Sequence, residues 1–462
     1  MRLSFHGADR AVTGSCHMIE CLDKRILIDC GMLQGSREMA DENADPFGFD
    51  PRTVDHVLLT HAHLDHCGRL PLLVKRGFRG DVIATSATHE LARLVIVDAA
   101  HLQEEETRRR SRQNRRCATG EDAQPLYTLV DAFNSFDRFG KVAEYGKPLQ
   151  VAPGIRATFF DAGHILGSAS ILLEIDEGAG TRTILFSGDI GNAGRPMLRP
   201  PSTPEQAEFI VMESTYGDRL HRSISDSVDE LYTAIADTFA RGGNVIIPTF
   251  ALERAQEILF FLHRGIASNR FQPSTQVFLD SPMAISATEI FEHHPECFEP
   301  SVAQLFAEGK DPLQLPGLHL ARDAADSIAI NRVSGGVIVM AGSGMCTGGR
   351  VRHHLKHNLW RKESAVIFVG FAGGGTLARQ IIDGAKHVRL FGEDIPVRAR
   401  IHTINGFSAH ADQGELVAWH DRIGGSKATF LVHGEEKAMK ELTLRLPNQR
   451  VEMPRLHDRF DL

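Results

Sequence analysis

The segment Thr60-His61-Ala62-His63-Leu64-Asp65-His66 directly follows the apolar run Val57-Leu58-Leu59 and holds three imidazoles and one carboxylate. A buried strand that runs out into a loop at Thr60 lets the first two histidines, which are two residues apart, point toward one metal ion. The aspartate and the third histidine then turn toward a second ion. This stretch therefore predicts a metal site at the end of a buried strand.

Three further candidate ligands lie far downstream in short loop-like settings, namely His164, Asp189 and His433. With the first segment they make seven nitrogen and oxygen donors, which is enough for two zinc ions. Imidazole and carboxylate suit zinc at an open catalytic site, and no cysteine is interleaved as a closed structural site often requires. Isolated histidines are expected at the surface or in the core, among them His89, His101, His357 and His387.

Length and composition indicate a globular protein that is too long for one ordinary domain. The chain has 462 residues, of which 42% are hydrophobic and 24% charged, so we expect two domains. Neither an apolar stretch of the roughly 18 residues that cross a bilayer nor a signal-peptide core is present, and we expect a cytoplasmic location without a membrane. An odd number of cysteines, seven, without a Cys-x-x-Cys pair favours free thiols.

The formal net charge of −8 argues against a protein that coats nucleic acid by bulk attraction, but it does not exclude a focused basic groove. One conspicuous basic run, Arg108–Arg116, follows three glutamates, and in a helix it gives ion pairs four residues apart. The expected pairs are Glu104 with Arg108, Glu105 with Arg109, and Glu106 with Arg110. We therefore predict a solvated helix end followed by a mobile insertion, with a nucleic-acid contact as the alternative.

The first part of the chain reads as short strands around one long helix, which is expected from about Ala87 to Glu106. The strands are predicted at 15–21, 25–29, 55–59, 155–160, 169–175, 183–186 and 208–212. After Tyr216 the pattern changes to a helix over 226–241 followed by apolar strands typical of a parallel sheet. These strands are predicted at 244–248, 276–279, 336–340 and 365–369.

From about Ile395 the strand-rich pattern resumes through Arg398–Thr403, so the first domain is predicted to be interrupted by the second. The predicted ranges are 1–217 for the first part, 218–393 for the inserted domain and 394–462 for the return segment. Two Gly-rich turns, 341–349 and 370–376, lie in the inserted domain between a strand and a helix. They are either tight turns or sites that present backbone N–H groups to phosphate.

In this order, the residues resemble the β-CASP branch of the metallo-β-lactamase superfamily over essentially the whole chain. The superfamily motifs match Asp29, the segment His61–His66, His164 and Asp189, and the motifs particular to β-CASP nucleases match Glu213, His410 and His433. The resemblance implies an α/β fold, in which a metallo-β-lactamase αββα sandwich is interrupted by a parallel α/β β-CASP domain. The chain looks most like the compact prokaryotic RNA-processing members, related to the endonuclease subunit of the cleavage and polyadenylation specificity factor.

The family's functional residues carry over as follows. His61, His63 and His164 look like ligands of one zinc ion, Asp65, His66 and His433 look like ligands of the other, and Asp189 looks like the bridging carboxylate. Asp29 would hydrogen-bond a ligand or bound water. His410 would be the general acid, with Glu213 as its orienting partner. Ser408, Thr376 and Ser343 are weaker candidates for contacts with the substrate.

The resemblance implies hydrolysis of RNA phosphodiester bonds by a water activated by two zinc ions, in RNA processing or decay. His410 would protonate the departing 3′ oxygen. Histidine at the position of His433 points to single-stranded RNA, because the DNA-repair branch usually has an apolar residue there. Endonucleolytic cleavage is the first prediction and 5′ exonucleolytic cleavage stays open. Family members are often dimeric, but no interface signal is visible, so a homodimer stays open as well.

Two rival functions are possible from the sequence. A small-molecule hydrolase of the wider superfamily would share the metal ligands, but it needs neither the inserted domain nor His410. A non-catalytic RNA-binding scaffold of the same family usually has decayed ligands, whereas every ligand is present here. The zinc content of the purified protein would separate the scaffold from an enzyme.

Overall fold

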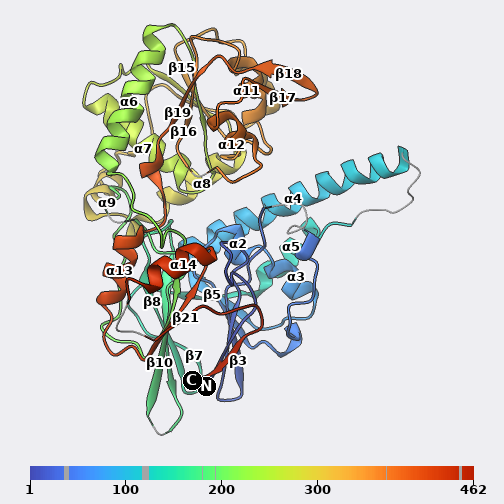
Figure 1. The fold of residues 1–462 in the computed structure, drawn as a ribbon, viewed down its shortest axis with the longest axis vertical. Helices are drawn as coiled ribbons and strands as arrows, with labels where there is room; N and C mark the ends of the chain where they lie inside the picture. The colour runs from blue at the N-terminus through green and yellow to red at the C-terminus, as the bar shows by residue number, and fades with distance from the viewer. Residues whose placement is uncertain (36–40, 117–123, 179, 193, 371, 447–449) are drawn as a thin grey trace. The chain divides into compact units, whose positions relative to one another are not determined.

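The computed structural model describes residues 1–462 except 36–40, 117–123, 179, 193, 371 and 447–449. The chain forms two compact units (Figure 1). The first unit comprises Met1–Ala193, Pro200–Leu220 and His410–Leu462, and the second comprises Gly194–Arg199 and His221–Ala409. The chain therefore passes between the units at four places. The inserted domain was predicted to span 218–393, whereas the long segment of the second unit spans His221–Ala409.

The described part of the first unit contains two sheets of seven strands. In spatial order, the first sheet consists of β22 (Arg459–Asp461), β1 (Arg2–Phe5), β2 (His17–Cys21), β3 (Lys24–Ile28), β4 (His56–Leu58), β5 (Asp81–Thr85) and β6 (Phe139–Ala143). The second sheet consists of β21 (Val451–Glu452), β20 (Ala428–Val432), β11 (Phe209–Glu213), β10 (Thr181–Phe186), β9 (Ala169–Asp176), β8 (Ile155–Asp161) and β7 (Leu149–Ala152).

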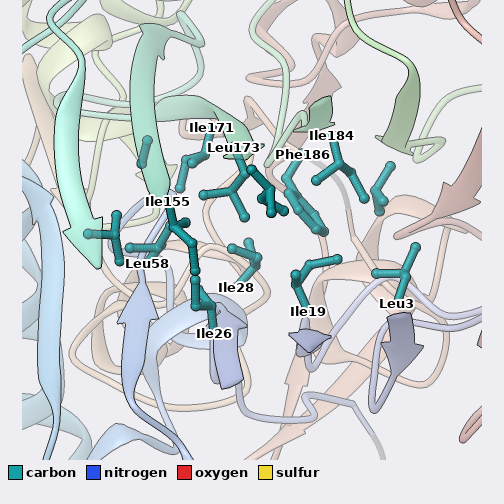
Figure 2. Packing of buried hydrophobic residues seen from close by; sticks show 14 of the residues in the cluster. Leu3, Ile19, Ile26, Ile28, Leu58, Ile155, Ile171, Leu173, Ile184 and Phe186 are labelled. Carbon is teal, nitrogen blue, oxygen red and sulfur yellow. The ribbon is translucent and has the colours of Figure 1, made fainter. Parts of the chain in front are cut away.

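The two sheets pack face to face through alternating apolar side chains. Along β3, Ile26 and Ile28 are two residues apart and point to the same side, and along β9 Ile171, Leu173 and Ile175 do the same. Figure 2 shows Ile26 and Ile28 of the first sheet and Ile171 and Leu173 of the second meeting between the sheets. Burial of each such side chain contributes about 1.5–3 kcal/mol, so this interface is the main core of the unit.

Helices cover the outer faces of both sheets. α4 (Ser86–Arg116) packs on β5 and β6 of the first sheet, and α13 (Gln413–Asp421) and α14 (Glu436–Thr443) bury Trp419 and Met439 against the second. The other helices of the unit whose bounds lie within the described residues are α2 (Leu64–Cys67), η1 (Pro51–Thr53), α3 (Leu70–Lys75), α5 (Leu129–Ser135) and η2 (Phe136–Arg138). The layers are helix, sheet, sheet and helix, which confirms the predicted sandwich.

The helix α4 is longer than predicted, because it continues through the basic run to Arg116 and extends beyond the sheets of its own unit (Figure 1). Arg108 pairs with Glu104 at 3.1 Å and Arg110 with Glu106 at 2.9 Å, as predicted. The predicted pair of Arg109 with Glu105 is wrong. The guanidinium of Arg109 instead bonds to Glu106, three residues earlier in the helix, at 2.7 Å. The predicted mobile insertion falls on 117–123, outside the described residues.

The second unit is built on a sheet whose described strands all pair in parallel. Its spatial order is β14 (Leu318–Leu320), β13 (Gln276–Leu279), β15 (Val337–Ala341), β12 (Val245–Pro248), β16 (Ala365–Phe368) and β19 (Arg400–Thr403). The predicted strand over 398–403 belongs here, because β19 pairs with β16. Residues 394–409 therefore lie in the second unit.

Helices and one hairpin surround this sheet. They are α6 (Ile224–Ala240), α7 (Arg254–Ala267), α8 (Pro282–Glu292), η3 (Pro295–Cys297), α9 (Pro300–Ala307), α10 (Ala324–Ile330), α11 (Val351–Asn358), α12 (Leu377–Ile382) and η4 (Asn405–Phe407). The hairpin is formed by β17 (His387–Leu390) and β18 (Glu393–Pro396), which pair antiparallel.

The short segment Gly194–Arg199 is fastened to the rest of the second unit by buried charges. Arg195 lies 3.0 Å from Glu257 and 3.1 Å from Glu253, and all three side chains are buried. Arg254 also bonds to Glu257. The backbone N–H of Glu299 donates to the carbonyl of Met197 at 3.0 Å. The segment is thus an integral part of this unit, although it interrupts the sequence of the first.

Two further predictions concern free thiols and membrane-spanning segments. Within the described residues Cys16, Cys21, Cys30, Cys67, Cys297 and Cys346 are free thiols, and Cys117 lies outside them. None of the helices in the described ranges combines the length and the apolar character needed to cross a bilayer.

Candidate metal centre

The candidate ligands of the first unit gather where neighbouring strands end. β10, β11 and β20 run parallel in adjacent positions, so their carboxyl ends lie at one edge of the second sheet. β3 and β4 are likewise parallel neighbours in the first sheet. The residues that follow or end these strands are Asp29, Thr60–His66, Asp189, Glu213 and His433, and the loop after β8 adds His164. Strand register thus brings together residues that are up to hundreds of positions apart in the chain.

Four donors form a first cluster. Nδ1 of His63 lies 3.1 Å from Nε2 of His61 and 3.1 Å from Nε2 of His164. Oδ2 of Asp189 lies 3.4 Å from the first of these Nε2 atoms and 3.5 Å from the second. A tetrahedral ion with bonds of 2.0–2.1 Å needs donors about 3.3 Å apart, so these separations match zinc coordination.

A second cluster contains Asp65, His66 and His433. Nε2 of His433 lies 3.4 Å from Oδ2 of Asp65. The other oxygen of Asp189, Oδ1, lies 3.4 Å from Nε2 of His66 and 3.5 Å from Nδ1 of His433. Asp189 therefore presents one oxygen to each cluster, which is the arrangement expected of a bridging carboxylate.

The buried atoms of these clusters fit metal cations better than they fit one another. Nε2 of His66 and Oδ1 of Asp189 face each other and have no further hydrogen-bond partner among the described residues. Polar atoms buried without partners are costly, and bound cations would satisfy them. The donors are imidazole nitrogens and carboxylate oxygens without a thiolate, a set that suits zinc and also manganese.

Asp29 and Thr60 orient the ligands from behind. Nδ1 of His66 donates to Oδ2 of Asp29 at 2.7 Å, so its Nε2 is left for the cluster. The backbone N–H of Thr60 donates to Oδ1 of Asp29 and its hydroxyl to Oδ2, both at 2.8 Å. Asp29 and His433 have φ of 61° and 47°, a left-handed conformation that is uncommon outside glycine and that clusters at functional sites.

The roles of Thr60 and Thr215 were not predicted from the sequence. The hydroxyl of Thr60 also lies 3.1 Å from Nδ1 of His61, and the hydroxyl of Thr215 lies 3.1 Å from Nδ1 of His433. Thr60 directly precedes a candidate ligand and Thr215 follows Glu213 by two residues. The sequence offers one indication of these roles, namely that each threonine stands close to a candidate site residue. This indication is weak, because hydroxyl residues are common in loops.

His410 and Glu213 form a pair at the rim of the first cluster. Nδ1 of His410 lies 3.2 Å from both oxygens of Glu213, whose side chain is fully buried. The N–H of Ile190 donates to Oε1 of Glu213 at 2.5 Å and holds this carboxylate in place. Burial lowers the pKa of His410, but the charges of Glu213 and Asp189 outweigh it and raise the pKa to about 9. The imidazole is therefore protonated at neutral pH, as a general acid must be.

Two of the candidate ligand histidines, His61 and His63, are in the opposite state to His410. Burial lowers the pKa of His61 well below its usual value and that of His63 to about 4, so both imidazoles are neutral and able to bind a cation. For His66, burial also lowers the pKa, but Asp189 and Asp29 reverse this and raise it. The same two carboxylates that raise its pKa surround its ring nitrogens, which is consistent with a cation position at Nε2.

The three candidate substrate contacts belong to the second unit and are not members of the donor clusters. The hydroxyl of Thr376 accepts a hydrogen bond from Arg379 N at 3.2 Å as the N-cap of α12. Oγ of Ser343 accepts a bond from Gly348 N at 3.3 Å inside its own loop. Ser408 is buried, two residues before His410. Two of these hydroxyls thus serve their own turns, and the substrate role of all three stays a prediction.

Comparison with known families agrees with this arrangement. The metallo-beta-lactamase superfamily model matches residues 10–248, the Beta-Casp domain model matches 255–381, and the model of the Zn-dependent metallo-hydrolase RNA specificity domain matches 394–452. The three matches follow the order of the predicted domains along the chain.

Relatives with curated names cover nearly the whole chain. Ribonuclease TTHA0252 of Thermus thermophilus is 40% identical over 457 residues, which is 98% of either chain. Transcription termination factor FttA of Methanocaldococcus jannaschii is 32% identical over 94% of this chain and 67% of its own. An RNase J-like protein of the same organism is 30% identical over 94% of this chain and 92% of its own.

A crystal structure of a protein of unknown function from Enterococcus faecalis V583 has a similar fold, with a TM-score of 0.57 and 12% identity, covering 100% of this chain and 99% of that one. The family models, the identities of 30% or more and the strand-end clusters lead to one assignment, which confirms the resemblance seen in the sequence. The chain belongs to the β-CASP branch of the metallo-β-lactamase superfamily of metallo-hydrolases.

Proposed function

We propose that this protein is a zinc-dependent ribonuclease that hydrolyses phosphodiester bonds within single-stranded RNA. The observation that carries the proposal is the pair of donor clusters joined by Asp189, with the charged His410 beside the first of them. A small-molecule hydrolase would have use for the clusters, but not for a protonated imidazole held by a buried glutamate.

His61, His63 and His164 would hold one zinc ion, and Asp65, His66 and His433 would hold the other, with Asp189 shared. Two zinc ions bound there supply Lewis-acid stabilisation of negative charge on a phosphate group and lower the pKa of water. Asp29 accepts hydrogen bonds from His66 and from Thr60, and these bonds fix the imidazole that faces the second ion, so the ligand positions are set before an ion binds.

His410 supplies the proton. Its Nδ1–H is held by both oxygens of Glu213, which leaves Nε2–H to donate to the oxygen that leaves phosphorus. Because Glu213 keeps the imidazole charged at neutral pH, the proton is present when the bond breaks. Protonation of the 3′ oxygen gives products with a 5′-phosphate and a 3′-hydroxyl.

RNA is favoured over DNA as the substrate on two grounds. One is His433, which stands where DNA-repair members of the family usually have an apolar residue. The other is the name of the relative that is 40% identical, which is a ribonuclease, together with the match to an RNA specificity domain. An internal cut is the first choice, and 5′ exonucleolytic cleavage is the alternative to be tested.

The test uses zinc-loaded protein and one RNA that carries a 5′ label and a 5′ triphosphate, beside the same sequence as single-stranded DNA. Metal content is measured on the same preparation. Discrete internal fragments from RNA alone support the proposal. Mononucleotides that appear only after the triphosphate is removed indicate a 5′ exonuclease instead.

Two results contradict the proposal as a whole. Two zinc ions per chain without cleavage of either polymer favour a small-molecule hydrolase. Purified protein that binds RNA but retains no zinc favours a non-catalytic scaffold.

A further inference from the structure

The turn between β17 and β18 holds Phe391 in a conformation that bulky residues rarely adopt. Phe391 has a φ of 51° and Gly392 a φ of 85°, and Leu390 pairs with Glu393 across this two-residue loop. Hairpin loops of this kind need positive φ at both positions and favour Asn, Asp or Gly at the first. Because a left-handed conformation strains a phenylalanine, local backbone preference does not explain the residue.

Packing of the hairpin does not explain Phe391 either. The hairpin is anchored by Val388, Leu390 and Ile395, which are buried in the same core cluster as Leu355 of α11. Phe391 lies outside this cluster and is 47% exposed. A residue in a strained conformation whose aromatic ring is about half exposed is a candidate for binding a ligand.

Two side chains in the first turn of α11 hold the ring. The imidazole of His353 stacks on Phe391 with ring centroids 4.3 Å apart and an interplanar angle of 24°. The guanidinium carbon of Arg352 lies 5.0 Å from the centroid of the phenyl ring. Burial, His354 and Arg352 lower the pKa of His353, so this imidazole is neutral at pH 7. An aromatic ring with a neighbouring imidazole and guanidinium is a common platform for stacking nucleobases.

The charges around the turn favour a polyanion, although the whole chain has a net charge of −8. Among the described residues Arg352, Lys386 and Arg389 have no ion pair, so their charges remain available. The carboxylate of Glu393 is neutralised by Lys356 at 2.6 Å. Asp394, opposite Arg389 in strand register, is the other carboxylate of the hairpin. Cations therefore exceed carboxylates here, in contrast to the rest of the chain.

We infer that the Phe391 turn, with Arg352 and His353, is a base-stacking contact for single-stranded RNA outside the metal centre. One base would stack on the exposed part of Phe391, and Arg352, Lys386 and Arg389 would meet the neighbouring phosphates. The inference rests on the proposed ribonuclease function, since that proposal identifies RNA as the polymer. A protein partner is the competing occupant of the same surface.

The variant Phe391→Asn tests the inference without a folding problem. Asparagine suits a left-handed turn position, so the melting temperature should stay the same or rise. The affinity of the zinc-loaded, full-length protein for a labelled oligouridine, measured by fluorescence anisotropy, should fall about 5- to 100-fold, the usual contribution of one stacked base. Phe391→Tyr keeps a ring in the same turn and should retain the affinity. Phe133→Ala, which removes an exposed aromatic ring from the first unit, is the matched control and should bind normally.

The outcomes separate this inference from the proposed function. If Phe391→Asn binds RNA as tightly as the wild type, the stacking contact does not exist. If the variant changes only the sedimentation behaviour of the protein and not its affinity for RNA, the surface binds protein and the inference is wrong. If the wild type neither binds nor cleaves RNA, the proposed function fails and the inference fails with it. Wild-type cleavage with an unaffected variant overturns the inference alone.

Discussion

Each unit of the molecule contains a buried histidine bonded to a buried aspartate, and the two pairs differ in what their other atoms contact. His66 and Asp29 of the first unit are 2.7 Å apart, and His354 and Asp280 of the second are 2.6 Å apart. In the second unit Asp280 also accepts hydrogen bonds from Arg350 at 2.7 Å and Ser327 at 2.6 Å. The remaining nitrogen of His354 lies 2.9 Å from Asn331.

Completeness distinguishes a structural cluster from a binding site. The polar atoms of the Asp280 cluster have partners within the protein, so it stabilises the second unit and needs no ligand. In the first unit Nε2 of His66 faces Oδ1 of Asp189 without another partner among the described residues. Burial and a histidine–carboxylate bond are common to both clusters. In the described residues, the first-unit cluster has potential ligand atoms, His66 Nε2 and Asp189 Oδ1, without a hydrogen-bond partner, and such atoms indicate a cation site.

The largest effect is expected from removing a donor from the first unit. His63→Ala should abolish RNA hydrolysis and reduce the bound zinc, because its Nδ1 is within 3.1 Å of two other donors. Metal analysis and the gel assay measure both. His56→Ala, on strand β4 before the metal segment, is the control and should keep zinc and activity. Full activity with both ions retained in His63→Ala would exclude this residue from the centre.

His410→Gln should lower kcat by about 10²- to 10⁴-fold, the usual contribution of a general acid. Zinc content should not change, because His410 is bonded to Glu213 and acts as an acid in this proposal, not as a ligand. Single-turnover cleavage measures the rate on loaded protein. Loss of one zinc ion from this variant would instead make His410 a ligand, and the assignment of the second cluster would have to change.

In the second unit the expected effect is on stability. Asp280→Asn removes the anion that pairs with Arg350 and His354, and breaking such a buried pair should lower the free energy of unfolding by about 3 kcal/mol. Urea denaturation measures the loss, and Glu393→Gln at the exposed Lys356 pair is a control with a change below about 1 kcal/mol. A change in zinc content of the folded variant would contradict the division between the two clusters.

The smallest effect is a shift in pH dependence. A general acid works while protonated, so the rate should fall as the pH rises through the pKa of His410, which is about 9 without ions and lower when zinc is bound. Glu213→Gln removes a carboxylate that raises this pKa, and the alkaline limb of kcat should move to lower pH. The same raised pKa stabilises the fold below the ordinary pKa near 6.5, and this contribution is lost toward pH 9. An unmoved limb would remove Glu213 as the orienting partner.

The residues of the candidate metal centre could be picked out from the sequence because they lie in short motifs at strand ends. Periodicity located most strands within a few residues, since buried strands are apolar runs bounded by turns. Strand register then brings Asp189 and His433 to one edge of the second sheet, and Asp29 follows β3 of the first sheet. No local pattern in the sequence reveals this pairing of distant strands. The family motifs supplied that long-range information.

Other features could not be read from the sequence. β19 looked like a strand of the return segment, because nothing in Arg400–Thr403 indicates that its partner is β16. The helix α4 runs past Glu106 because pairs such as Glu106–Arg110 stabilise the basic run as helix. The cluster around Asp280 was not predicted because its members lie in or beside three separate elements, β13, α10 and α11, with no motif to join them.

The segment Gly194–Arg199 limits how this protein can be divided. An inserted domain can often be removed as one continuous piece. Here that would mean excising residues 221–409 and joining Leu220 directly to His410 in the first unit. Such a cut would take Arg195 away from Glu253 and Glu257, two buried carboxylates. An uncompensated buried charge costs several kcal/mol, so residues 221–409 alone are a poor choice for recombinant expression. A recombinant fragment that keeps these ion pairs therefore has to begin at or before Gly194.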